Sequence, residues 1–281
     1  MKKTFPRHLA AIAALSVLLT GGIAYAGDAP AVSELNGKAA FAAGYHDQEN
    51  MAGEEYSGLF LGSLTAPLTH DFGFQADTVL GSRDGNSLAG IGGHLFWRDP
   101  AKGLVGITGS YLGANYDNGA PDHNVTRFGG EAELYHGQFT LALTSGYQNG
   151  QNVEDGYYGS AIGYWYANDN LRLGIGAAKD PVLDTSGLAD VEFQPGFASM
   201  PGMTFFAKST IGKDDYVSAQ AGIRFYFGKD KNLKLRNRED DPMANLPGDT
   251  VDSSTANDPV AACLARGPYY FWRDGLCRHA I

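Results

Sequence analysis

Charged side chains recur at every second position in several segments of this sequence. In TRFGGEAEL, Arg127, Glu131 and Glu133 alternate with apolar residues, so one face of an extended chain would be charged. Carboxylates beside a guanidinium can carry out acid-base chemistry, but they can also pair with one another. The same pattern gathers the following residues on one set of strand faces: Lys38, Asp77, His94, Arg127, Glu131, Glu133, Arg172, Asp190, Glu192, Lys208 and Arg224.

The sequence lacks the common signatures of catalytic and metal sites. G-x-S-x-G, H-E-x-x-H, C-x-x-C and G-K-[ST] do not occur. His94 falls within a predicted strand, and the other candidate bases fall in predicted turns or at loop ends: His46, His70, His123 and His136. We interpret all five as solvated or rim histidines rather than catalytic bases. We therefore expect no enzyme activity, no catalytic residue, no metal site and no cofactor.

The elements that carry these residues are predicted to be strands. From residue 34 to 227 the chain divides into about twelve runs of alternating apolar and small or polar residues, each ending in Gly, Asp, Asn or Pro. The last run, YVSAQAGIRFYFG, places Val217 and Phe227 on one face and Arg224 on the other. The runs cover residues 34–46, 55–67, 71–82, 87–98, 103–116, 124–136, 138–148, 156–167, 170–180, 187–195, 202–212 and 216–227.

The links between these runs differ in length. Short links (LTH, DPAKG, HG, NDN) follow the second, fourth, sixth and eighth runs, and longer acidic ones (DQENMAGEE, DNGAPDH, NGQNVEDG, DPVLDTSG) follow the first, fifth, seventh and ninth. RDGN, KDD and PGFASMPG break the contrast. The pattern predicts an all-β, antiparallel up-and-down transmembrane barrel of about 12 strands, with both termini on the short-turn side. A soluble β-sandwich, which alternates in the same way, is the alternative.

The N-terminal segment indicates export of the protein, and the net charge limits its partners. Residues 1–26 have a basic start, an apolar stretch and small residues at Ala24 and Ala26, which predicts a cleaved secretory signal peptide. That segment contains three of the 21 Lys and Arg residues and none of the 31 Asp and Glu, so its removal shifts the net charge from −10 to −13. Such an acidic chain argues against nucleic acid as a partner.

Aromatic residues gather at the strand ends on the predicted short-turn side. Rings with a polar edge favour the boundary between lipid and water, so we interpret the cluster as an aromatic girdle in contact with membrane lipid. The residues are Phe72, Phe74, Phe96, Trp97, Tyr135, Phe139, Tyr164, Trp165, Tyr166, Phe205, Phe206, Phe225, Tyr226 and Phe227.

The signal peptide, the alternating strands and the final strand AGIRFYFG resemble bacterial outer-membrane β-barrel proteins of the porin-like kind. The resemblance covers residues 27–228 and implies an outer-membrane location in a Gram-negative bacterium. Phe225 and Phe227 are similar to the C-terminal signal that the barrel-assembly machinery of such proteins recognises, which implies that machinery as a partner. In the family this strand usually ends the chain, whereas here more than fifty residues follow.

Inward charges need either water or partners, because a dry core does not tolerate many of them. The lumen-lining residues could pair and fill the barrel, or could line a path for small polar solutes. We expect a porin-like channel; a structural or interaction protein with a filled lumen is the alternative, and an outer-membrane lipid hydrolase is less favoured. Inward glycines are predicted to leave space for water: Gly44, Gly73, Gly106, Gly129, Gly146, Gly174, Gly176 and Gly222.

Residues 229–281 are predicted to be a periplasmic tail, mostly disordered. The stretch from Asn245 to Pro259 is rich in Pro, Ser, Thr, Asp and Gly, as linkers are. Cys263 and Cys277 are the only cysteines, and in an oxidising compartment we expect them to form a disulfide that closes a small loop. That loop, with its aromatic residues, could bind a periplasmic partner or the cell wall, or could dock against the mouth of the barrel.

Overall fold

The structure, a computed structural model, describes residues 29–47, 54–115, 122–213 and 215–242, and the backbone of 270–273 and 276–279. The predicted signal peptide, residues 1–26, lies outside the described residues, as do Cys263 and the side chain of Cys277. The cleavage site and the disulfide therefore stay predictions.

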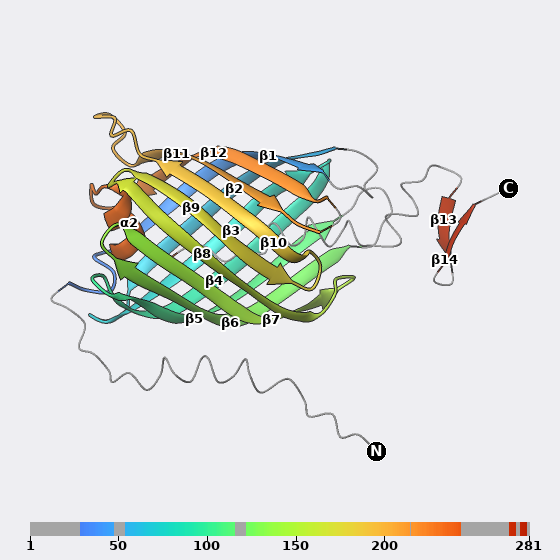
Figure 1. The fold of residues 1–281 in the computed structure, drawn as a ribbon, viewed down its shortest axis with the longest axis horizontal. Helices are drawn as coiled ribbons and strands as arrows, with labels where there is room; N and C mark the ends of the chain where they lie inside the picture. Colours follow the sequence, from blue (N-terminus) through green and yellow to red (C-terminus); the bar gives the residue numbers. More distant parts are fainter. Residues whose placement is uncertain are drawn as a thin grey trace, which may run out of the picture.

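Twelve antiparallel strands form a closed barrel, shown in Figure 1, in which each strand pairs with its sequence neighbours and β1 pairs with β12. Closure leaves no strand edge without a partner. The predicted fold class is confirmed, and each predicted run overlaps one strand. The strands are β1 (Asn36–Asp47), β2 (Glu55–Pro67), β3 (Phe72–Arg83), β4 (Asn86–Asp99), β5 (Gly103–Asn115), β6 (His123–His136), β7 (Phe139–Gln151), β8 (Gly156–Asn168), β9 (Leu171–Asp180), β10 (Asp184–Phe193), β11 (Met203–Ile211) and β12 (Val217–Phe227).

The barrel has two ends, which we name by their links. At the turn end β1 begins and β12 ends, and most links there are short, as in residues 137–138 and 169–170. At the opposite, loop end, the links after β7 and β9 are only residues 152–155 and 181–183. For these two links the predicted length is wrong, because Asn152 and Asp184 adopt positive φ angles of 59° and 56° and let the strands continue into tight turns. The links after β1 and β5, residues 48–54 and 116–122, are longer, as expected.

The outer face of the barrel is apolar. Large hydrophobic side chains point outward and are exposed in the isolated chain, with Ile91 and Phe128 each 65 % exposed and Ile175 75 % exposed. A continuous apolar belt around a closed barrel is the surface that a lipid bilayer covers. Among the described residues, no helix has the length and apolar character required to span a bilayer.

The aromatic cluster at the turn end divides between the two faces. Rings such as Phe72, Phe139 and Phe227 are exposed on the outer face, as a girdle requires. The girdle prediction is wrong for six members, whose side chains are buried because their strand positions face the lumen: Phe96, Tyr135, Tyr164, Tyr166, Phe206 and Tyr226.

After β12 the chain folds over the turn end instead of leaving the barrel. Gly228, with a φ of 101°, turns the chain, and the short helix α2 (Leu233–Glu239) follows, capped by Asn232, whose Oδ1 accepts a hydrogen bond from the Leu235 amide at 2.9 Å. Figure 1 shows α2 at one end of the barrel. Residues 229–242, which we call the plug segment, are thus ordered, and this helix was not predicted. Further along, β13 (Tyr270–Arg273) and β14 (Leu276–His279) form a two-stranded antiparallel sheet.

Candidate functional site

The interior of the barrel holds a cavity of about 340 Å³, lined by charged, hydroxyl and apolar side chains. At the turn end it is lined by Lys38 and by Asp241 and Pro242 of the plug segment, and at the loop end by Lys179 and Leu183. The inward side chains of the lining include five basic and three acidic ones: Lys38, Arg127, Arg172, Lys208 and Arg224, against Asp180, Asp190 and Asp241. Glu192, buried beside the wall, pairs with Arg172 and Arg224, so the wall carries charges of both signs in nearly equal number.

The structure brings the residues singled out from the sequence together inside the barrel. Six of them line the cavity: Lys38, Arg127, Arg172, Asp190, Lys208 and Arg224. The other five are buried beside it in two hydrogen-bonded clusters or against the turn end: Asp77, His94, Glu131, Glu133 and Glu192. Among the described residues, no group of three or more His, Cys, Asp or Glu is arranged to hold a metal ion.

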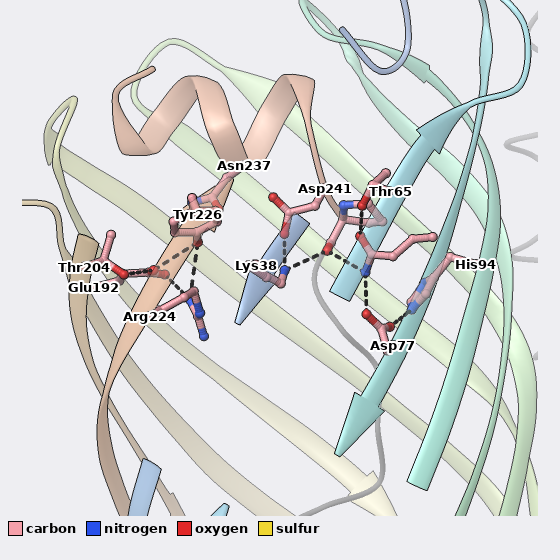
Figure 2. Close-up of polar contacts among 12 residues, drawn as sticks. Lys38, Thr65, Asp77, His94, Glu192, Thr204, Arg224, Tyr226, Asn237 and Asp241 are labelled. Atoms are coloured by element: carbon pink, nitrogen blue, oxygen red, sulfur yellow. Dashed lines mark hydrogen bonds and ion pairs between the residues drawn. The ribbon is translucent and has the colours of Figure 1, made fainter. Parts of the chain in front are cut away.

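Glu192 on β10 is the centre of the first cluster, and Figure 2 shows it beside Thr204, Arg224 and Tyr226. Its Oε2 lies 2.7 Å from Arg224 Nη1 and 3.1 Å from Arg172 Nη2, and its Oε1 accepts hydrogen bonds from Thr204 Oγ1 at 2.9 Å and Tyr226 Oη at 3.0 Å. Because the carboxylate is fully buried, these partners replace the water it would otherwise need. The cluster connects four neighbouring strands, β9 to β12, through one side chain.

His94 on β4 is the centre of the second cluster. Its Nε2 lies 2.8 Å from Asp77 Oδ2 and its Nδ1 lies 2.8 Å from Glu131 Oε2. Two carboxylate neighbours can both accept a hydrogen bond only from a ring that carries two protons. His94 is 1 % exposed, so the interpretation as a solvated or rim histidine is wrong for this residue; His46 and His123, at 0 % and 2 %, are not solvated either. We interpret His94, Asp77 and Glu131 as an ion-pair cluster with a structural role.

Four inward aromatic rings lie on glycines, and an arginine lies on each ring. Tyr158 on β8 reaches over Gly146 and Gly129, where an added Cβ would meet its ring or hydroxyl at 2.8 Å, and the Arg127 guanidinium carbon is 4.5 Å from the ring centroid. The same arrangement occurs in three other sets: Gly174, Tyr164 and Arg172; Gly222, Phe206 and Arg224; and Gly73 with Gly106, Phe96 and Arg98.

These sets correct the prediction that inward glycines leave room for water. The missing side chain is replaced by a ring from a neighbouring strand, and cation-π contact then fixes the arginine above it. The error has a clear physical cause: alternation identifies which residues face inward but not how far a neighbouring side chain leans across them. The space that does remain is the cavity described above.

The plug segment is anchored to two neighbouring turns of the barrel, between β6 and β7 and between β8 and β9. Arg238 donates hydrogen bonds to the carbonyl oxygens of Gly137 at 3.1 Å and Phe139 at 2.7 Å, and Lys234 Nζ lies 2.6 Å from Asp169 Oδ1. Burial raises the pKa of the Asp240 carboxyl, which Lys231 and Ser33 oppose by their hydrogen bonds.

The end of the plug segment lies inside the lumen, as Figure 2 shows. Asp241 forms an ion pair with Lys38, and the Pro242 carbonyl oxygen accepts a hydrogen bond from Gln75 Nε2 at 3.2 Å. Gln75 also donates to Asp77 Oδ1 at 2.9 Å and accepts from Thr65 Oγ1 at 2.8 Å. A continuous set of polar contacts therefore joins the plug segment to the His94 cluster.

One histidine lies beside a serine in a way that the sequence did not indicate. His46 Nε2 is 3.0 Å from Ser57 Oγ, a distance at which a histidine can act as the base for a serine nucleophile. The pair faces the lumen, with His46 0 % and Ser57 8 % exposed, so the hydroxyl is shielded from a lipid substrate outside the barrel. We interpret the bond as structural.

Several residues of the site were missed by sequence reasoning. Gln75, Thr65 and Thr204 are uncharged and gave no signal beyond their inward strand position. Asp241 and Asn237 lie after the last strand, where only the charged run REDDP marks the segment. The Asn237 amide donates to Tyr166 Oη at 3.2 Å, a contact that requires the unpredicted helix.

Comparison with known proteins indicates the fold alone. No protein-family model and no curated protein matches the chain. Among solved structures, the KdgM porin in complex with disordered oligogalacturonate superimposes with a TM-score of 0.50 at 7 % identity, covering 67 % of this chain and 99 % of that one. The Acinetobacter baumannii outer membrane protein Omp33 gives a TM-score of 0.46 at 10 % identity over 69 % of this chain and 99 % of its own. Outer membrane phospholipase A from Escherichia coli gives 0.45 at 9 % identity over 68 % and 92 %.

The closed 12-strand barrel, its apolar outer face and its polar interior define this chain as an outer-membrane β-barrel in fold. The resemblance inferred from the sequence is confirmed at this level.

Proposed function

We propose that this protein is a gated outer-membrane channel for small polar solutes, with the turn end and the plug segment toward the periplasm. The observation that carries the proposal is the cavity of about 340 Å³, which runs from the plug segment to the loop end along a wall of charged side chains. A barrel that served only as a scaffold would not need an internal space with lining residues at both of its ends. The fold shared with the KdgM porin supports the same class.

The plug segment supplies the gate in this proposal. Asp241, Pro242 and Asn237 form the turn-end wall of the cavity, so solutes can pass only when the segment moves. Its attachment by ion pairs and hydrogen bonds, rather than by a large apolar surface, is compatible with opening, since such contacts exchange readily with water.

The alternative function is that of a structural or interaction protein with a filled lumen. The pairing of Glu192 with two arginines and the four rings lying on glycines favour it, because both reduce the free space. We do not propose an enzyme, since the buried Ser57 and His46 do not face the membrane.

Conductance in planar bilayers tests the proposal. We expect the full chain to show rare openings, and a variant ending at Phe227, which lacks the plug segment and everything after it, to show steady conductance steps. If the shortened variant still forms a heat-modifiable barrel on a gel but conducts no current, the lumen is filled and the alternative holds. If both proteins conduct equally, the plug segment is not a gate.

A further inference from the structure

We propose that the chain after the plug segment passes through the lumen, so that residues 243–259 lie along the cavity and residues 260–281 emerge at the loop end. On the orientation proposed above, the barrel would hold its own C-terminal segment on the outer surface of the cell. This contradicts the periplasmic tail expected from the sequence. It does not require that the barrel conduct.

The first observation is where the described chain ends. Pro242 lies inside the lumen, bound through its carbonyl oxygen to Gln75 Nε2 at 3.2 Å and to Lys38 Nζ at 3.4 Å. Its residue neighbour Asp241 is 3 % exposed. Both residues belong to the wall of the cavity. The 39 residues that follow Pro242 therefore begin inside the barrel rather than beside it.

The second observation is that the turn end is already occupied. Helix α2 lies across it, with Arg238 bound to the turn between β6 and β7 and Lys234 bound to the turn between β8 and β9. Residues 29–35 fill another part: Val32 is buried with Phe96 and Leu104, and the Arg98 guanidinium donates to the Ala31 carbonyl at 3.1 Å. A chain returning to the turn end would have to displace these contacts, whereas the cavity lies open ahead of Pro242.

The third observation is the length available. The 17 residues from 243 to 259 can reach about 55 Å when extended. The hydrocarbon core of a bilayer is about 30 Å thick. The segment can therefore traverse the barrel with several residues to spare, which leaves 260–281, including the β13–β14 sheet, beyond the loop end.

The fourth observation is the composition of the segment. Residues 243–265 contain Asp249, Asp252 and Asp258 but no Lys, Arg, His or aromatic residue. The wall they would face carries five inward basic side chains, against Asp180, Asp190 and Asp241 and the Glu192 that pairs with Arg172 and Arg224. A segment of mostly small residues, with acidic but no basic side chains, thus places no like charge beside these arginines and lysines and needs little width.

The test is the accessibility of the C-terminus on intact cells. Single cysteines are introduced into full-length protein that carries Cys263→Ser and Cys277→Ser, and cells are treated with a maleimide-polyethylene glycol too large to cross the outer membrane. Ala280→Cys reports the C-terminus, Asn152→Cys the loop end and Lys102→Cys the turn end, where the Lys102 side chain is 60 % exposed. We expect Ala280→Cys to be labelled on intact cells together with Asn152→Cys, and Lys102→Cys only after permeabilisation. Any result in which Ala280→Cys is not labelled on intact cells overturns the proposal.

Two further measurements check display of the C-terminus and passage through the lumen independently of the labelling. When intact cells are treated with trypsin, the unmodified chain should be cut after Arg266 or Arg273. Both sites lie between Cys263 and Cys277, so the cut is read on a gel after reduction of the predicted disulfide; a C-terminus that is still uncut after reduction argues against display. The path through the lumen is tested by oxidation of Gly248→Cys with Ala178→Cys, because Gly248 lies six residues past Pro242, within an extended reach of about 20 Å.

Ala178 lines the cavity, whereas its neighbour Ala177 is exposed on the outer face and provides the matched control. A cross-link with Ala178→Cys but not with Ala177→Cys is expected. No cross-link with Ala178→Cys, or equal cross-linking with both, contradicts passage through the lumen. Failure of the channel proposal, by contrast, would appear only as absent conductance and would leave these results unchanged.

Discussion

Removal of the Lys38 charge should release the plug segment. Lys38 and Asp241 form an ion pair in which the side chains are 12 % and 2 % exposed. Removing one partner of a buried pair costs about 3–5 kcal/mol, because the other charge stays buried without compensation. Lys38 retains some exposure, so we take the lower value, about 3 kcal/mol. That corresponds to an increase of about 150-fold in the ratio of open to closed plug segment.

Trypsin cleavage of the purified barrel measures this ratio. The plug segment contains five trypsin sites, Lys229, Lys231, Lys234, Arg236 and Arg238, which a protease reaches when the segment leaves the turn end. When opening and closing are fast relative to cleavage, the rate follows the open population. We therefore expect Lys38→Met to be cleaved in this segment about 150-fold faster than the unmodified protein.

The controls separate the ion pair from a general loss of charge. Lys102→Met removes an exposed lysine at the same end of the barrel and should leave the cleavage rate unchanged. The double variant Lys38→Met with Asp241→Leu leaves no unpaired buried charge and should regain much of the protection. Cleavage of Lys38→Met at the unmodified rate would refute the reasoning, as would equal rates for the double and single variants.

Three other predictions concern the clusters, the rings on glycines and the turn end. Glu192→Gln should lower the free energy of unfolding by about 3 kcal/mol, because Arg172 and Arg224 lose their shared carboxylate. The loss is measured as a lower temperature at which the heat-modifiable gel band disappears. Asp184→Asn, in an exposed pair with Lys179, should not change that temperature. Gly174→Ala, whose Cβ would lie 2.7 Å from the Tyr164 ring, should lower the free energy of unfolding by about 1–3 kcal/mol in the same assay. Gly163→Ala, whose Cβ would meet its nearest atom only at 3.8 Å, should be tolerated. Equal effects of the two substitutions would contradict the packing of the ring on Gly174. The hydrogen bond from Lys234 lowers the pKa of the Asp169 carboxyl. The stability that this contact contributes is therefore present above the unfolded pKa of about 3.9 and is lost as pH falls through the lower folded value. Amide exchange in α2 should accelerate there, and Asp169→Asn should remove that part of the pH dependence.

The barrel could be predicted from the sequence because each strand carries its own signal. In β12, Val217 to Phe227 alternate between the two faces, and this period of two identifies both the strand and its buried side. The inward charged residues followed from the same rule, since a position such as Arg224 or Glu192 needs only its register to be placed in the lumen.

The rest depends on contacts between distant residues. Nothing in the sequence around Gly146 indicates that Tyr158 will lie on it, because that contact depends on how neighbouring strands stagger in the closed barrel. The plug segment was missed for a related reason. Helix α2 is only seven residues long, too short to be stable alone, and is held by Asp169 and Gly137 from far earlier in the chain.

The rings on glycines also limit which strand pairings the barrel can adopt while it assembles. Tyr158 on β8 reaches past β7 to β6, so its contacts with glycines form only when all three strands are in the correct register. A slip of two residues would keep the inward and outward pattern intact, and alternation alone could not reject it. Such a slip would, however, move the ring from Gly146 onto a residue with a side chain. Each strand that bears such a ring therefore disfavours misaligned pairing with its neighbours. The four sets together act in this way before β1 pairs with β12 and closes the barrel.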